Sequence, residues 1–359
     1  MYRLNLLSLT AALTLGLGAA TTGFADLYYV GDTAANAAVA GGGAWNNSTV
    51  NWSTNTPAGT KNSAWTPGGD AQFQGTAGGT VTVGDNLNVG SATFTAVAGS
   101  FTISNSYDIE VNGAGISNNS LVTQTVTNPG GTINFNNSSS ASGGSAPVTY
   151  STVSTLNFNN SSTAGNASIN NSGVLTFNNT ATGGSASVTN SSFMDISGLS
   201  TTGISLSSLN NSGSVTLGTG AGGAGKSLGL TSLTEQGGSE VEFTLGTASS
   251  LITAGSVTDS ASPSNQIGID TDAGAGFGLS LYTLINDVGG TLNLNDYVLN
   301  SAPVGYTLAV LDSGHNLDLV AVPEISSFLL PVLGAASLVI WLRRRRNSVM
   351  DSMIAGSAV

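Results

Sequence analysis

The chain has 359 residues, no cysteine, and a formal net charge of −12 at pH 7, with only 7% charged residues. The lack of cysteine excludes disulfides and thiolate metal sites, and the acidic balance argues against nucleic-acid binding through phosphate neutralisation. With 40% apolar residues the chain is too hydrophobic for a fully disordered protein, so a folded body rich in Gly, Ser, Thr and Asn is expected.

Residues 1–25 have the pattern of a secretory signal peptide. A basic start that ends at Arg3 is followed by the apolar run Leu4–Leu17 and then by small residues. The pattern predicts cleavage between Ala25 and Asp26 and export of the rest of the chain. A membrane-spanning N-terminal helix is the alternative, but the run is too short and too rich in Gly and Ala for one.

Residues 26–79 are expected to form an N-terminal cap. They contain Trp45, Trp52 and Trp65 among many glycines. The first turn of a stacked β-structure has an open edge and an exposed core end, and large aromatic side chains can cover both. An exposed aromatic platform for carbohydrate is the alternative interpretation of these tryptophans.

Residues 80–227 contain short alternating strands and an internal repeat. The first predicted strands are Thr80–Val83, Leu87–Phe94, Ser100–Ile103 and Tyr107–Val111. One motif then recurs at Ile133–Asn137, Leu156–Asn160, Leu175–Asn179, Met194–Ile196 and Val215–Leu217, in steps of 23, 19, 19 and 21 residues. A second series with the same period is Ala167–Asn171, Ala186–Asn190 and Leu209–Asn211.

This periodicity predicts an all-β fold, a right-handed parallel β-helix. Each unit is too small to bury its own apolar face, so neighbouring units must stack. Phe and Ile would then line the interior. The Asn pairs would turn the corners, where Asn tolerates left-handed backbone and can bond to neighbours above and below. A β-sandwich is the competing fold, but it does not account for the 19-residue period.

The stretch from residue 45 to residue 320 resembles the autotransporter-associated β-strand repeat proteins. The likeness lies in the Trp-Asn-x-x-x-x-Asn-Trp opening at Trp45–Trp52, in Gly69-Asp70-Ala71-x-Phe73, and in the Asn-Phe-Asn-Asn rungs. It implies a passenger-like surface β-helix. The chain has no room for the translocating membrane barrel of a true autotransporter.

The segment Gly220–Ser227 fits the phosphate-binding pattern G-x-x-x-x-G-K-S. A working loop of this kind must lead into a helix whose N-terminus holds the phosphates. The residues after Lys226 instead alternate like a strand, so we interpret the match as chance. No nucleotide and no other cofactor is expected.

Residues 228–321 are expected to finish the body as a C-terminal β region, with strands at Glu240–Leu245, Leu279–Ile285 and Tyr306–Leu319. This region holds ten of the 17 carboxylates between Asp26 and Ala321, while Asp195 is the only charged residue between Val111 and Gly225.

Some of these residues suggest chemistry. Glu240 and Glu242 would share one strand face. Asp270 and Asp272 precede glycines and could offer oxygen ligands to calcium. His315 lies in a predicted hairpin turn, which leaves no evident general base.

A second hydrophobic segment, Ile325–Leu342, lies within residues 322–346. Its 18 residues give about 27 Å of helix, close to the roughly 30 Å hydrocarbon core of a bilayer. A basic cluster follows directly and should remain cytoplasmic; it consists of Arg343, Arg344, Arg345 and Arg346. We therefore expect a membrane anchor with residues 347–359 as a cytoplasmic tail. A buried helix of a globular domain is the alternative.

The order of Val322, Pro323, Glu324 and Ile325, a short hydrophobic helix and an arginine cluster resembles the PEP-CTERM sorting signal of exported Gram-negative proteins. Ile325 stands where that family has its second proline. The resemblance implies recognition by an exosortase, an integral-membrane processing enzyme, and association with extracellular polysaccharide and biofilm. It concerns the sorting of the protein rather than the activity of its body.

Two hypotheses of different classes follow. The first is a non-enzymatic, surface-associated structural or adhesive β-helix without catalytic, cofactor or metal site. Its expected location is the membrane, the cell surface or the extracellular matrix, and its expected partners are the inner membrane, an exosortase-type enzyme and polysaccharide. The second is a secreted carbohydrate-active enzyme, a lyase or glycosidase, with its site in the carboxylate-rich region from Glu235 to Asp318.

Overall fold

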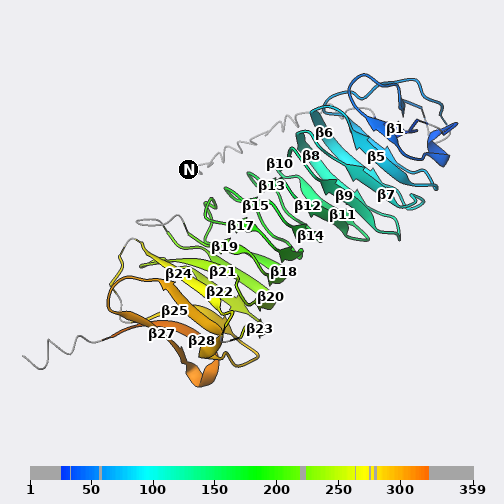
Figure 1. The fold of residues 1–359 in the computed structure, drawn as a ribbon. Helices are drawn as coiled ribbons and strands as arrows, with labels where there is room; N and C mark the ends of the chain where they lie inside the picture. The colour runs from blue at the N-terminus through cyan, green and yellow to red at the C-terminus, as the bar shows by residue number, and fades with distance from the viewer. Residues whose placement is uncertain are drawn as a thin grey trace, which may run out of the picture.

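The computed structural model describes residues 26–322 except residues 33, 56–58, 219–223, 263, 275 and 279–280. This part of the chain is all-β apart from three 3-10 helices: η1 (Ala37–Val39), η2 (Leu294–Asp296) and η3 (Asp312–Gly314). Two 14-stranded sheets form an elongated stack that runs from the blue N-terminal end to the orange C-terminal end in Figure 1.

The first sheet contains, in spatial order, β26 (Tyr297–Ser301), β24 (Ile267–Ala273), β21 (Glu240–Leu245), β19 (Ser214–Thr216), β17 (Phe193–Asp195), β15 (Val174–Phe177), β13 (Thr155–Phe158), β10 (Thr132–Phe135), β8 (Ile109–Asn118), β6 (Leu87–Phe94), β4 (Asp70–Phe73), β1 (Asp26–Tyr29) and β3 (Trp52–Ser53), with β11 (Ser140–Gly144) beside β8. The second contains β2 (Gly43–Trp45), β5 (Gly79–Val83), β7 (Phe101–Ser104), β9 (Gln124–Asn128), β12 (Val148–Thr152), β14 (Ser168–Asn171), β16 (Ser187–Asn190), β18 (Gly203–Asn211), β20 (Ser227–Gln236), β22 (Leu251–Ala254), β25 (Leu281–Asp287), β28 (Asn316–Ala321) and β27 (Tyr306–Leu311), with β23 (Val257–Ser260) beside β20.

The chain alternates between the two sheets, so most neighbours within a sheet are parallel strands from successive repeats. The exceptions lie at the two ends of the stack. There β3 pairs antiparallel with β1, and β28 pairs antiparallel with both β25 and β27. This arrangement of long parallel sheets is compatible with a β-helix-like fold.

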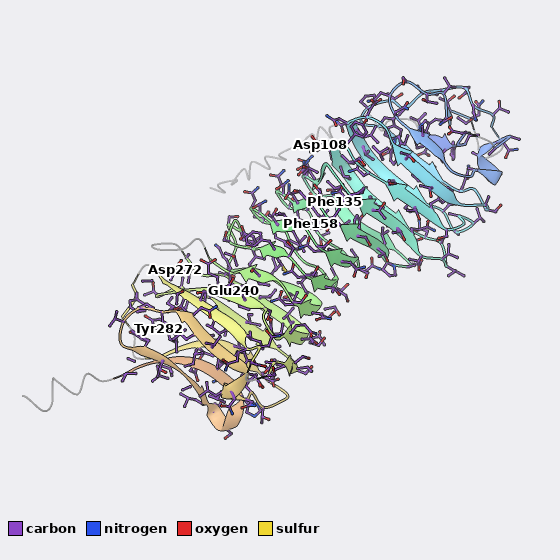
Figure 2. All side chains as sticks on the ribbon, in the orientation of Figure 1. Asp108, Phe135, Phe158, Glu240, Asp272 and Tyr282 are labelled. Carbon is purple, nitrogen blue, oxygen red and sulfur yellow. The ribbon has the colours of Figure 1, made fainter. Side chains whose placement is uncertain are left out.

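The register of the sheets confirms the predicted repeat alignment. In the first sheet Phe135 pairs with Phe158, and Phe158 pairs with Phe177. Their rings stack nearly parallel, with centroid distances of 5.3 and 4.8 Å. Figure 2 labels Phe135 and Phe158 on neighbouring strands. The repeats of the second sheet are aligned in the same register, since Ile169 pairs with Val188.

The predicted strand Tyr107–Val111 is longer in the structure, where β8 continues to Asn118. In the structure a Cβ at Gly113 would lie 2.4 Å from the carbonyl oxygen of Gly90. The glycine is therefore needed because two rungs approach closely, and the strand passes through it.

Asparagines turn the corners as predicted. Asn137, Asn160 and Asn179 have φ angles of 54°, 55° and 58°, the left-handed region that Asn tolerates. The residue before each corner joins an outer ladder of side-chain amides. Nδ2 of Asn178 donates to Oδ1 of Asn159 at 3.0 Å, and Nδ2 of Asn159 donates to Oδ1 of Asn136 at 3.1 Å.

A second, inner ladder runs through the buried end of the second sheet. Nδ2 of Asn171 donates to Oδ1 of Asn190 at 2.8 Å, and Nδ2 of Asn190 donates to Oδ1 of Asn211 at 2.9 Å. Nδ2 of Asn171 also donates to the backbone oxygen of Phe193 at 2.9 Å. A carbonyl oxygen can only accept, so this contact fixes which way the amide faces.

The three tryptophans of residues 26–79 are buried, with exposed fractions of 2% for Trp45, 0% for Trp52 and 3% for Trp65. Their ring centroids lie 4.9 to 5.3 Å apart, and Phe73 joins the group. Buried rings offer no face to a ligand, so the interpretation as an exposed carbohydrate platform is wrong.

Within the described residues no helix is long and apolar enough to cross a membrane. The predicted span Ile325–Leu342 and the signal peptide lie outside the residues that the structure describes.

Replacing Phe158 by Ala should lower the free energy of unfolding by about 3–5 kcal/mol, because it leaves a cavity inside the ring stack. Chemical denaturation followed by circular dichroism measures the loss. Phe193→Ala is the control, since Phe193 is 36% exposed and should cost less than about 1 kcal/mol. Equal losses for both variants would contradict the interior placement of Phe158.

Replacing Asn171 by Ala should cost about 2–4 kcal/mol, because it leaves buried donors and acceptors of the inner ladder without partners. The adjacent Asn170 is exposed on the same strand, and Asn170→Ala should change stability by less than about 0.5 kcal/mol. Thermal or chemical melts of the two variants give the comparison. A similar cost at both positions would show that the ladder does not stabilise the stack.

Candidate functional site

An acidic cleft of about 340 Å³ lies on the outer face of the first sheet, near its C-terminal end. We define the acidic cleft by four carboxylates, Glu240 and Glu242 on β21 and Asp270 and Asp272 on β24. The two strands are parallel neighbours, and Glu242 pairs with Asp270. Alternation along each strand turns all four side chains to the same face. Figure 2 labels Glu240 and Asp272 there.

The pKa values of three carboxyl groups of the acidic cleft are shifted in different directions. The hydrogen bond to Asp270 raises the pKa of Glu240, and burial adds to this. Burial would raise the pKa of Asp270, but hydrogen bonds from Glu240, Ser301 and Asn300 outweigh it and the pKa falls. Burial, together with the neighbouring Asp272, raises the pKa of Glu242. Such a difference is what an acid and base pair needs.

Asp270 and Asp272 lie on a strand rather than in a calcium-binding loop. Asp270 accepts a hydrogen bond from the hydroxyl of Ser301 at 2.7 Å. In the described part of the chain no group of three or more His, Cys, Asp or Glu side chains is placed to hold a metal ion.

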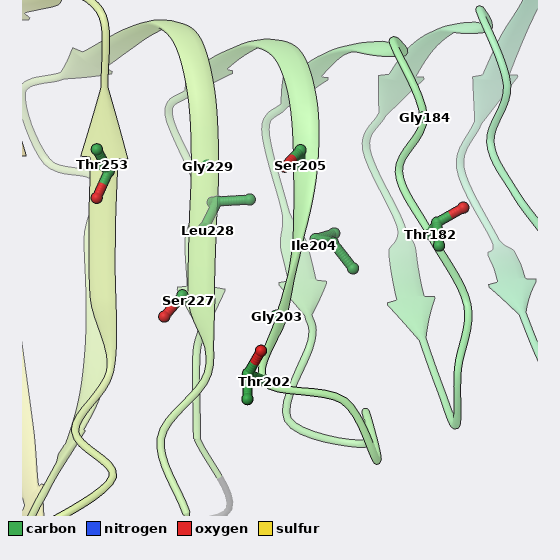
Figure 3. A pocket seen from close by; sticks show the side chains of 10 residues that line it. All are labelled: Thr182, Gly184, Thr202, Gly203, Ile204, Ser205, Ser227, Leu228, Gly229 and Thr253. Atoms are coloured by element: carbon green, nitrogen blue, oxygen red, sulfur yellow. The ribbon is translucent and has the colours of Figure 1, made fainter.

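An uncharged hollow of about 560 Å³ lies on the second sheet, where β18 and β20 begin (Figure 3). We call it the hydroxyl hollow; it is lined by Thr182, Gly184, Thr202, Gly203, Ile204, Ser205, Ser227, Leu228, Gly229 and Thr253. Its walls combine five hydroxyl side chains with two aliphatic ones and glycine backbone. Such a lining can donate and accept hydrogen bonds without charge.

The hollow arises where one side of the stack changes from isolated bridges to full strands. Thr163 and Thr182 pair only through a single bridge, whereas Gly203 begins a strand of nine residues. A Cβ at Gly203 would lie 1.9 Å from the carbonyl oxygen of Ser227, so only glycine fits this close approach. The widening therefore leaves a hollow beside the first rung of the broader part.

Lys226 and Ser227, from the phosphate-loop pattern, do not lead into a helix. Ser227 begins the ten-residue strand β20, as the alternation predicted. The Lys226 side chain is buried and donates to the backbone oxygen of Thr201 at 3.2 Å. Residues 219–223 of this segment lie outside the described residues. The described part therefore lacks the helix N-terminus that phosphate binding needs.

Most of the residues predicted for signal cleavage and sorting lie outside the residues that the structure describes. Asp26 begins β1, and Val322 is exposed after β28. The remaining ones lie beyond the described ranges: Ala25, Pro323, Glu324, Ile325, Arg343, Arg344, Arg345 and Arg346. His315 caps η3 between β27 and β28, which confirms the predicted turn.

The enzyme hypothesis is wrong for three carboxylates of the candidate region, which are buried and cannot contact a substrate: Glu235, Asp287 and Asp318. Glu235, the first residue of that region, is fully buried. It pairs with Asn211 and so occupies an inner-ladder position. The signal was present in the sequence, because Leu233-Thr234-Glu235 aligns with Leu209-Asn210-Asn211.

This chain matches none of the protein families, curated proteins or solved structures with which it was compared. The resemblances to PEP-CTERM proteins and to autotransporter-associated repeats therefore remain predictions from the sequence.

Proposed function

We propose that this protein is an exported, surface-associated structural or adhesive protein, sorted by a C-terminal PEP-CTERM-like signal and associated with exopolysaccharide. The observation that carries the proposal is the uncharged outer ladder. Each rung adds one row of amides and hydroxyls to the outer face, and Asp195 is the only charged residue between Val111 and Gly225.

The finer fold that we propose is a right-handed parallel β-helix with an aromatic N-terminal cap and one C-terminal membrane helix. Parallel crossover connections within a sheet are right-handed in about 98% of cases. The buried tryptophans at the start of the stack support the cap. The membrane helix rests on the length and hydrophobicity of Ile325–Leu342 alone.

Polysaccharide would bind through many weak hydrogen bonds, and the hydroxyl hollow, of about 560 Å³, is an uncharged recess that could receive it. Thr182, Thr202, Ser205 and Thr253 are all exposed around it. A neutral or weakly charged glycan avoids the repulsion that the acidic chain exerts on anions. Repetition of the rows along the stack would add avidity.

A secreted carbohydrate-active enzyme is the second candidate, and the acidic cleft favours it. Glu240 and Glu242 have raised pKa values beside Asp270, whose pKa is lowered, and glycoside hydrolysis needs one carboxyl of each kind. The cleft has no basic residue among its described lining residues, which disfavours a lyase that abstracts a proton with lysine or arginine.

The binding prediction uses a variant that removes hydroxyls while keeping side-chain shape. Thr182→Val, Thr202→Val and Thr253→Val together should weaken binding to purified exopolysaccharide about tenfold or more, measured by titration calorimetry or co-sedimentation. Thr80→Val with Thr189→Val is the control, because both threonines are exposed on strands away from the hollow. Equal weakening by both sets would argue against the hollow as the contact.

The enzyme candidate is tested by a polysaccharide-cleavage assay on the purified protein. The structural proposal expects no turnover, because it assigns no catalytic role to the acidic cleft. Turnover that is abolished by Glu240→Gln or Glu242→Gln, with folding preserved, would reject the structural proposal and favour the enzyme.

The sorting proposal predicts that truncation after Ala321 releases the body as a soluble exported protein, because Ile325–Leu342 is the proposed span. Changing Arg343 to Arg346 to Asn should weaken retention, since they would fix the cytoplasmic side. Cell fractionation measures both. A truncated protein that still partitions with membranes would show that the body itself makes the attachment.

A further inference from the structure

Three carboxylates lie buried or half-buried at the C-terminal end of the inner ladder. They are Glu235 on β20, Asp259 on β23 and Asp287 on β25. Glu235 and Asp287 are 0% exposed, and Asp259 is half-buried. Burial of carboxylates normally requires a cation or a full set of hydrogen-bond donors.

The donors that reach these groups do not satisfy every oxygen. Oε2 of Glu235 accepts from Nδ2 of Asn211 at 2.9 Å and from the hydroxyl of Ser239 at 2.7 Å. Oδ2 of Asp259 accepts from the hydroxyl of Tyr297 at 2.8 Å. Oε1 of Glu235 and Oδ1 of Asp259 are both buried and have no partner.

The strand register places two of the three incompletely satisfied groups beside each other, because Glu235 pairs with Asp259 in the parallel ladder of β20 and β23. Oδ2 of Asp287 is the third buried oxygen without a partner. Two acceptor oxygens cannot satisfy one another, and a proton on one of them supplies the missing donor.

Among the described residues, no lysine or arginine faces this pair. Tyr297 on β26 faces both carboxyl groups, while Asp296 of η2 and Asp287 of β25 face Asp259. His315 reaches the backbone oxygen of Asp287 through Nδ1 at 2.8 Å. Both lysines of the described part lie elsewhere, since Lys61 and Lys226 donate to the backbone oxygens of Asp32 and Thr201.

The strand β23 is held by contacts that depend on these carboxyl groups. Within the described residues β23 pairs only with β20, so its other edge carries no strand. Besides that ladder, Tyr297 bonds to Asp259, and Oδ1 of Asp287 accepts from the backbone N–H of Val257 at 3.2 Å. An edge strand of four residues with so few anchors can open without breaking the main sheet.

We propose that Glu235 closes the inner ladder as a neutral carboxylic acid, and that its ionisation releases β23, so that the pair forms a pH-sensitive latch at the C-terminal end of the stack. Ionisation of Glu235 would leave two adjacent buried negative charges, on Glu235 and Asp259. It would also remove the proton that supplies the missing hydrogen-bond donor. Opening β23 lets water solvate both carboxylates, which relieves the desolvation and the repulsion together.

The electrostatics of the two groups support this direction. Burial raises the pKa of Glu235 from 4.5 to about 8, against the lowering effect of its hydrogen bonds from Ser239 and Asn211, and Asp259 adds a further raising effect. Burial likewise raises the pKa of Asp259 to about 6. Because the folded pKa of Glu235 exceeds the unfolded one, its stabilising contribution is full below 4.5 and is lost as the pH rises through 8.

Hydrogen exchange of the full-length protein in detergent, corrected for intrinsic exchange rates, tests the latch. Protection of the amides of Val257–Ser260 should fall roughly a hundredfold between about pH 6 and about pH 9, whereas the central strands keep theirs. Glu235→Gln should abolish the fall, because Gln is neutral and its amide can donate to Oδ1 of Asp259.

Glu110→Gln is the matched control. Glu110 also accepts two asparagine amides, from Asn134 and Asn136, but it is only half-buried on the outer face. In Glu110→Gln the amides of β23 should lose protection with rising pH to the same extent as in the wild type. Unchanged protection of wild-type β23 up to about pH 9, or an equal fall in Glu235→Gln, would overturn the proposal.

Infrared spectroscopy of the Glu240→Gln, Glu242→Gln variant, which lacks the other two glutamates with a raised pKa, keeps the test decisive if Glu235→Gln does not fold. A protonated carboxyl band should be present near neutral pH in this variant and should disappear on the same pH rise that lowers the protection of β23. Absence of any such band at neutral pH would refute a neutral Glu235. A band that persists while β23 opens would refute the coupling.

Discussion

Amide side chains that hydrogen-bond from one rung to the next hold the two sheets in register. With 7% charged residues and no cysteine, the chain has few side chains for ion pairs and none for disulfides. The two ladders point in opposite directions along the stack. Outer amides donate toward the N-terminal end, where Asn134 and Asn136 reach Glu110 and a branch continues from Asn136 through Asn112 to Asn88. Inner amides donate toward the C-terminal end and finish on Glu235. A carboxyl group is a suitable end for a ladder of amides, because its carbonyl oxygen accepts from the last amide in either protonation state.

The parallel pairing of the strands also determines how the two ends of the stack must be closed. Parallel sheets leave an open edge and an exposed core end, and the chain closes each end with different means. At the N-terminus three buried tryptophans cover the core and β3 pairs antiparallel with β1. At the C-terminus β28 pairs antiparallel with β25 and β27, but Leu308 and Val310 of β27 remain only partly buried. The two closures therefore differ, and the less buried one lies beside the carboxyl latch.

The central fold could be predicted because the repeat period is visible in large apolar residues, and these residues must stack on one another to be buried. Phe135, Phe158 and Phe177 recur with their Asn corners, and a 19-residue step leaves one possible register. The acidic cleft could be predicted only in part. Glu240 and Glu242 share a face by alternation, but Val241 pairs with Ile269, 28 residues on. Because the spacing between paired strands grows from 19 to 28 residues, the repeat no longer shows which segment pairs with β21. Asp270 and Asp272 therefore resembled a calcium-binding loop rather than a neighbouring strand.

The distribution of charge connects the ladders to the proposed function. Neutral amides hold the central rungs together, so their outer face needs no charged side chains and can meet a partner through hydrogen bonds that salt does not screen. The carboxylates gather instead beyond Gly225, where the rungs lengthen and the repeat is lost. There the structure contains both an exposed acidic cleft and the buried pair of Glu235 and Asp259. The proposed contact with a neutral polymer and the proposed response to pH therefore meet on one strand, because β20 lines the hydroxyl hollow at its start and carries Glu235 near its end.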